Sequence, residues 1–187
     1  MSAPSPGGPI GVLRLLVGIA LFRSGPQDLP VSRALLLWCI LGGVAARTLA
    51  LHLLSSQLQN DLLAILAVEA GATLLFVALV LAGAHRPERF LQTAGAVFGV
   101  QLVMLPLLAG VAWLLDTHQA DPFWRGPSTV LYIAANVWLL AVEARILRAA
   151  TDWTLMACVG LAILSDLVIY SLIALLFPMS SPLPAQA

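Results

Sequence analysis

Residues 61–84 read DLLAILAVEAGATLLFVALVLAGA, and Glu69 is the one charged side chain after the first position. At a rise of about 1.5 Å per residue, a helix of this length crosses the roughly 30 Å hydrocarbon core of a bilayer. A lipid-facing β-strand would instead alternate apolar and polar residues over about ten positions. The stretch therefore predicts a transmembrane helix.

The rest of the chain follows the same pattern. Of its 187 residues, 60% are hydrophobic and 10% are charged, whereas a soluble domain carries about 25% charged residues. Four further apolar runs are long enough to span a bilayer, at residues 32–54, 90–115, 128–148 and 154–177. We expect an all-α polytopic membrane bundle of five transmembrane helices, with the lipid bilayer as its main partner.

Shorter segments flank the predicted five-helix transmembrane domain, which covers residues 31–178. Residues 1–9 and 179–187 are rich in Pro, Ser, Gly and Ala, and we expect them to be disordered. Residues 10–30 begin with an apolar stretch that is too short to span and is interrupted by Arg14, and they end in a Gly/Pro-rich turn. This segment predicts a short helix that lies on the membrane face or dips into it.

The arginines give the bundle an orientation. All nine basic residues are arginine, and five spans place seven of them on the side of the N-terminus. These seven are Arg14, Arg23, Arg33, Arg86, Arg89, Arg145 and Arg148. The positive-inside rule then predicts a cytoplasmic N-terminus and a periplasmic C-terminus. The absence of lysine and the Ala/Leu/Val/Gly bias favour a GC-rich bacterial genome, hence a bacterial inner membrane. A formal net charge of zero argues against binding to nucleic acid.

Two opposite charges lie at one depth on neighbouring spans. Arg47 and Glu69 are each expected about 10–12 Å below the outer boundary of the bilayer. A lone charge at such a depth costs at least about 2.5 kcal/mol. The sequence therefore predicts a buried ion pair between these residues.

Each of the other three spans adds one polar residue to the middle or outer half of the bilayer. The predicted network consists of Arg47, Glu69, Gln101, Asn136 and Asp166. Glu143 lies nearer the cytoplasmic end, and we interpret it as an interfacial residue that reaches water. The network could fix the packing of the helices, form a pathway for a proton, ion or small solute with Asp166 as the titrating group, or recognise a partner.

A GxxxG pattern, Gly95-Ala96-Val97-Phe98-Gly99, lies in the third span. Small residues at this spacing let another helix approach closely. The sequence leaves open whether Gly95 and Gly99 pack against a helix of the same chain or against a second copy in a homo-oligomer.

No known catalytic pattern stands out. The sequence contains no HExxH, GxSxG, GxxxxGK[ST] or paired-aspartate lipid-transferase motif. Cys39 and Cys158 are not spaced as metal ligands, and the three histidines fall on both sides of the predicted membrane. We therefore expect a non-enzymatic protein without a metal or a cofactor.

Three short stretches carry a resemblance to a known family. They are Asp28-Leu29-Pro30 before the first span, Arg89-Phe90-Leu91-Gln92-Thr93 at the start of the third, and residues 138–148 at the end of the fourth. With five clustered spans, the chain resembles the Yip (Ypt-interacting protein) family and its bacterial relatives over about residues 13–177. The resemblance implies the five-span architecture; eukaryotic members are similar to membrane-trafficking adaptors that engage small GTPases.

These observations favour one function and leave an alternative. The missing catalytic motifs, the small polar loops and the short N-terminal helix favour a scaffold or regulator of a membrane partner. The alternative is a small transporter or channel subunit built around Arg47, Glu69 and Asp166.

Overall fold

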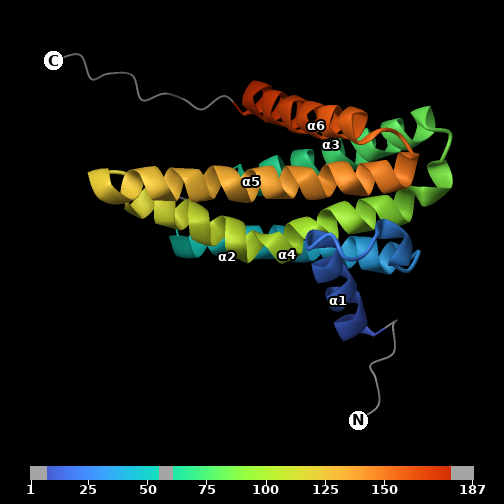
Figure 1. Ribbon diagram of the computed structural model, residues 1–187, viewed down its shortest axis with the longest axis horizontal. Coiled ribbons are helices and arrows are strands. Elements are labelled where there is room, and N and C mark those ends of the chain that lie inside the picture. The colour runs from blue at the N-terminus through green and yellow to red at the C-terminus, as the bar shows by residue number, and fades with distance from the viewer. Residues whose placement is uncertain (1–7, 55–60, 178–187) are drawn as a thin grey trace, which may run out of the picture.

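The computed structural model describes residues 8–54 and 61–177, and nearly all of this part of the chain is helical. Figure 1 shows the arrangement of the helices. The elements are α1 (Pro9–Ala20), η1 (Pro26–Asp28), α2 (Arg33–Leu54), α3 (Leu62–Gly83), η2 (Pro87–Arg89), α4 (Phe90–Thr117), α5 (Pro122–Thr151) and α6 (Leu155–Leu176). Five of the helices, α2 to α6, are long and apolar enough to cross a membrane. The predicted all-α bundle with five spans and a short N-terminal helix is confirmed.

Most helix ends lie within two residues of the predicted ones, and the clear exception is the beginning of α5. Residues 116–127 were expected to form a loop, yet α5 begins at Pro122. Proline is well tolerated at the first position of a helix, and the Asp121 carboxylate accepts a hydrogen bond from the Phe123 amide at 2.9 Å. The predicted disorder of residues 1–9 and 179–187 falls almost wholly outside the described residues, and Pro9 begins α1.

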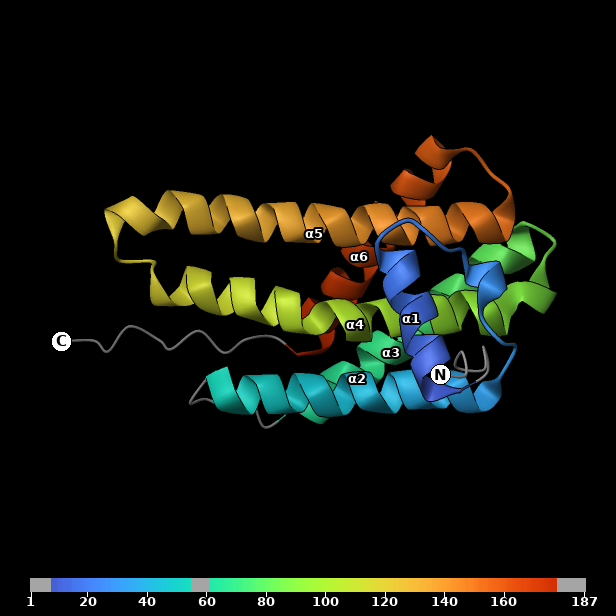
Figure 2. The same cartoon turned by 60° about the horizontal axis from the view of Figure 1, so that its bottom comes forward.

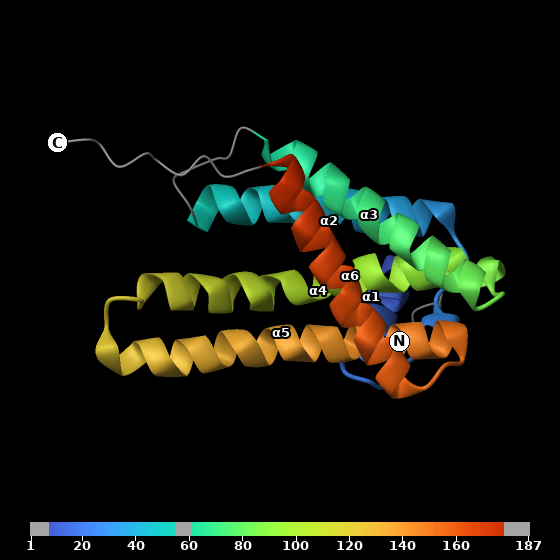
Figure 3. The same cartoon turned by 90° about the horizontal axis from the view of Figure 1, so that it is seen from above.

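The spans form two layers. Helices α2, α4 and α5 lie side by side in a row, and α3 and α6 cover one face of that row (Figure 3). Helix α1 lies across the opposite face, transverse to the spans (Figure 2). Helix α6 runs diagonally from the C-terminal end of α5 towards α3.

Helix α4 is the centre of the bundle. Residues 93–100 are all buried, so neighbours cover this part of α4 on every side. Pro106 lies further along the helix, and α4 bends near its middle (Figure 1). Proline removes one backbone hydrogen bond, and this is the ordinary cause of such a bend.

The GxxxG pattern of α4 makes a close contact with α1. A Cβ atom added to Gly99 would collide with the side chain of Leu16, whereas one added to Gly95 would meet nothing within 4 Å. Leu16 is 4% exposed, so it is seated in the space that Gly99 leaves. The Trp138 indole of α5 holds the other end of α1 through a 3.0 Å hydrogen bond from Nε1 to the Ala20 carbonyl oxygen. Helix α1 is thus a packed part of the bundle. It meets α4 at Gly99, the tenth residue of that helix.

The links at the arginine-rich end are tied together. Arg86 and Arg89 contact the Asp152 carboxylate at 2.9 Å and 3.4 Å, which joins the α3–α4 link to the α5–α6 link. Arg89 also donates to the carbonyl oxygens of Ala149 (3.0 Å) and Ala150 (3.1 Å), groups that the last turn of α5 leaves free.

Two segments that are far apart in the sequence touch each other at this end of the bundle. The Gln92 amide, in the first turn of α4, donates to the backbone oxygen of Leu29 at 3.0 Å and to that of Gln27 at 3.5 Å. The contact fixes the turn after α1 against the beginning of α4.

We expect the Gly99→Ala substitution to destabilise the protein by about 1–3 kcal/mol, because Leu16 must leave a filled position. The matched substitution Gly95→Ala should be neutral or stabilising by up to about 1 kcal/mol, since alanine favours helix and meets no neighbour. Thermal unfolding in detergent, followed by circular dichroism, measures both. In a Leu16→Ala background the cost of Gly99→Ala should disappear; equal losses at the two glycines would contradict the contact.

Candidate functional site

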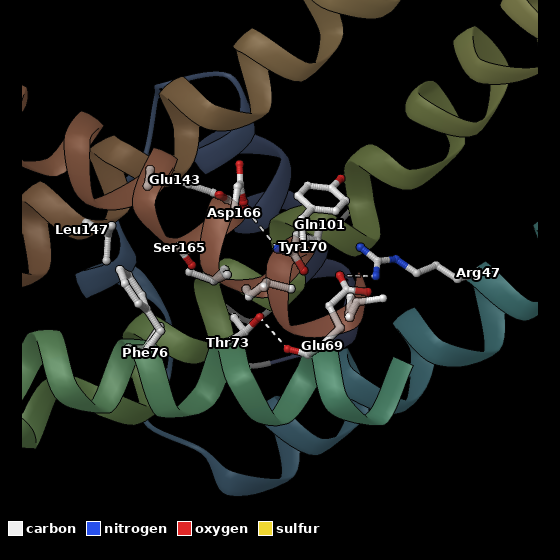
Figure 4. A pocket seen from close by; sticks show the side chains of 15 residues that line it. Arg47, Glu69, Thr73, Phe76, Gln101, Glu143, Leu147, Ser165, Asp166 and Tyr170 are labelled. Carbon is white, nitrogen blue, oxygen red and sulfur yellow. Dashed lines mark hydrogen bonds and ion pairs between the residues drawn. The ribbon is translucent and has the colours of Figure 1, made fainter. Parts of the chain in front are cut away.

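A cavity of about 270 Å³ lies between the two layers of the bundle. All five spans contribute to its lining, and Figure 4 shows the side chains around it. The polar lining residues are Arg47, Glu69, Thr73, Gln101, Glu143, Ser165, Asp166 and Tyr170. A water molecule occupies about 30 Å³ of liquid, so the space is large enough for several waters or a small solute.

One wall of the cavity contains an ion pair. Arg47 Nη1 of α2 donates to Glu69 Oε1 of α3, and the two side chains are 33% and 25% exposed. The two residues come from antiparallel neighbours and lie equally far from the ends of their helices. The structure therefore brings together the two charges whose depths match in the sequence.

A second polar contact joins α4 to α5. The Gln101 amide donates to Glu143 Oε1 at 3.0 Å, and both side chains line the cavity. The structure corrects the interpretation of Glu143 as an interfacial residue. Helix α5 continues to Thr151 rather than ending at residue 148, so Glu143 lies about 12 Å from the helix end. Its side chain faces the cavity beside Gln101.

The third carboxylate belongs to α6. Asp166 lines the cavity, and Tyr170 follows one turn later on the same face (Figure 4). Among the described residues, no hydrogen bond or ion pair involves the Asp166 carboxylate. Asp166 therefore reaches the cavity without a fixed partner.

The charges around the cavity do not balance. One arginine faces three carboxylates, those of Glu69, Glu143 and Asp166. If all were ionised, two negative charges would remain at membrane depth. An uncompensated charge there costs at least about 2.5–3.5 kcal/mol. The cavity is therefore suited to holding protons or a cationic solute. In the part of the chain that the structure describes, no group of three or more His, Cys, Asp or Glu side chains is placed to hold a metal ion.

Asn136 does not join the other four members of the predicted network. It is exposed, and its amide donates to the Tyr132 carbonyl oxygen one turn earlier at 2.8 Å. Helix α6 packs on α5 along residues 140–147 and then turns away. Asn136 lies beyond that contact, so its side of α5 is left uncovered.

The cavity also includes residues that the sequence analysis left out of the network, chiefly Glu143, interpreted there as interfacial, and Tyr170. Glu143 was detectable in principle, because Gln101 lies at a similar depth on the neighbouring span and could have been matched to it. Tyr170 has a weaker signal: it follows Asp166 by four residues, which places the two on one helix face.

Comparison with known protein families, curated proteins and solved structures gives no match for this chain. The function therefore has to be argued from the site itself.

We expect Arg47→Gln to destabilise the protein by roughly 1–3 kcal/mol, because the Glu69 carboxylate would lose its cationic hydrogen-bond partner. The double variant Arg47→Gln/Glu69→Gln should recover part of this loss, since two neutral amides replace the pair. Thermal unfolding in detergent is the measurement, and Arg125→Gln, at an exposed position far from the cavity, is the control. If the double variant is no more stable than Arg47→Gln, the loss of stability does not come from a Glu69 carboxylate without its partner.

Proposed function

We propose that this chain is a small multi-pass membrane transport protein that passes protons, or a small cation in exchange for them, through the cavity between its layers. A single observation carries the proposal: three carboxylates and one arginine line a hollow space inside the membrane-spanning part of the bundle. Ionisable residues at membrane depth that face a water-accessible cavity are typical of proton and ion pathways.

The polar groups lie at different distances along their helices from the arginine-rich end of the bundle. Counted from the arginine-rich ends of their helices, Glu143 lies about 12 Å deep, Gln101 and Asp166 about 16 Å, and Glu69 about 21 Å. Successive groups are thus separated by roughly one helical turn of depth. This series supports a stepwise path, along which waters could connect one carboxylate to the next.

The chemistry of the lining favours a proton over a metal ion. The carboxylates come from three different helices and do not converge as metal ligands. Ser165 and Tyr170 add hydroxyl groups, which both donate and accept hydrogen bonds and so can pass a proton.

A non-enzymatic scaffold or regulator of a membrane partner is the second candidate. Both polar contacts in the cavity, Arg47 with Glu69 and Gln101 with Glu143, join different helices, as a network that only holds the bundle together would. The resemblance to the Yip family supports this candidate through its adaptor-like members. The open space and the unpartnered Asp166 favour transport, because a structural network needs neither.

We place the protein in a bacterial inner membrane with its N-terminus in the cytoplasm. The beginnings of α2, α4 and α6 and the ends of α3 and α5 lie at one end of the bundle (Figure 1). Six of the nine arginines lie in the links or within two turns of the helix ends there, and a seventh, Arg14, belongs to α1, which precedes the first span. The positive-inside rule supports this orientation.

Asp166→Asn should lower proton flux about tenfold or more in liposomes, because an amide cannot take up and release a proton as a carboxyl group does. A pH-sensitive dye inside the vesicles reports the flux under an imposed potential. Stability should change by no more than about 0.5 kcal/mol, since the Asp166 side chain has no fixed partner to lose.

Asp61→Asn is the matched control for that experiment. Asp61 is an exposed carboxylate at the beginning of α3, it makes no side-chain cap, and it lies outside the cavity lining. Its substitution should leave the flux unchanged. If Asp166→Asn keeps the full flux while folding or the capture of a partner suffers, transport is the wrong function and the scaffold takes its place.

An alkaline-phosphatase fusion to the C-terminus should be active in a bacterial host, because five spans carry that end to the periplasm. A fusion in the link between α3 and α4, near Arg86, should be inactive. The reverse pattern would show that the bundle sits the other way round in the membrane.

A further inference from the structure

A second hollow lies at the arginine-rich end, on the outside of the bundle. It is a groove of about 710 Å³ between the C-terminal part of α5, the beginning of α6 and the chain that follows α1. Its lining includes Arg145, Arg148, Phe22, Trp153, Ala144 and Val159. The cavity described above is lined by the other side of α5, through Glu143 and Leu147, so the two spaces are separate.

The groove carries two positive charges that lack an anion. Arg145 and Arg148 are three residues apart on one helix face, and both are exposed. Neither forms an ion pair with a carboxylate among the described residues. The acidic residue at the groove, Asp152, is bound by Arg86 and Arg89 from the neighbouring link. The site is therefore complementary to a negatively charged group.

Both arginines lie within the last two turns of α5, the end of the helix that the positive-inside rule assigns to the headgroup region. Arg148 lies about 5 Å and Arg145 about 9 Å from the end of α5 at Thr151. Trp153 stands at the rim, where amphipathic rings collect at the membrane surface. The Arg145 guanidinium lies over the Phe22 ring, 5.4 Å from its centroid, which holds this charge in place at the groove.

The floor of the groove is apolar. Ala141 of α5 and Val159 of α6, both at least partly exposed, continue it from the arginines along the two helices. A small anion would leave this part uncovered, whereas the acyl chain of a lipid would lie along it. The combination of a charged mouth and an apolar floor fits an amphipathic anion.

We propose that this groove binds an anionic phospholipid, with the headgroup phosphate between Arg145 and Arg148 and an acyl chain along Ala141 and Val159. Basic pockets between transmembrane helices on the cytoplasmic side are suited to such headgroups. The site neither requires nor excludes transport through the cavity, because it uses a different face of α5.

The test uses the full chain in nanodiscs of mixed phosphatidylglycerol and phosphatidylcholine, followed by native mass spectrometry of the lipids that stay bound. The wild-type protein should retain phosphatidylglycerol preferentially. Arg145→Gln/Arg148→Gln should weaken this preference by about thirtyfold, the effect of two arginines near an anionic surface. Arg125→Gln, an exposed arginine at the other end of α5, should leave it unchanged.

Two further variants separate binding from folding. Arg148→Gln alone leaves the contact of Arg145 with Phe22 intact, so it should fold normally and still reduce the preference. Arg145→Lys/Arg148→Lys keeps both charges and should keep most of the preference for phosphatidylglycerol. Retention of phosphatidylglycerol by Arg148→Gln and by the double glutamine variant at the wild-type level would overturn the proposal.

A competition experiment distinguishes the lipid from a free anion. Millimolar inorganic phosphate should not displace phosphatidylglycerol, because it has nothing to place on the apolar floor. If inorganic phosphate removes the bound lipid and itself binds in pure phosphatidylcholine nanodiscs, the groove is an anion site and the lipid assignment is wrong.

Discussion

A polar side chain inside a bilayer has to find a partner in the protein or in trapped water, and this constraint organises the interior of the bundle. Arg47 meets Glu69 across the α2–α3 pair, and Gln101 meets Glu143 across the α4–α5 pair. Helix α6 brings Asp166 to the same place without a partner of its own. Two satisfied contacts, and one carboxylate without a partner among the described residues, make up the charged lining of the cavity.

The sequence predicted what depends on composition and on depth. Apolar run lengths gave the five spans, and counting residues from the helix ends was enough to match Arg47 with Glu69. The prediction failed where the rotation of a helix about its axis and the helices packed on it decide which side chains meet. Asn136 lies at a suitable depth but beyond the part of α5 that α6 covers. Glu143 was placed too near the surface because α5 runs three residues further than expected.

The packing of α1 was beyond the sequence for a related reason. A stretch of twelve residues with an arginine in it is typical of a surface helix, and nothing in its own pattern shows what lies beneath. The structure seats Leu16 against Gly99, so the small residues of α4 make room for a helix that does not span. The same GxxxG pattern would have fitted a contact between two copies equally well. Which helix fills the space depends on the path of the chain after α1, and the contact of Gln92 with Leu29 fixes that path.

The diagonal course of α6 has a consequence for how the protein is made. Only Cys158 and Ala162 of this helix are buried, whereas α4 buries ten residues. Helix α6 also follows the other four spans along the chain, so it leaves the ribosome after them, and α2 to α5 can settle against one another first. Until α6 arrives, the Arg47–Glu69 and Gln101–Glu143 contacts would exist side by side on an open face. Docking of the last span is then the step that adds Ser165, Asp166 and Tyr170 to the cavity lining, and a chain halted before residue 155 would assemble without that wall.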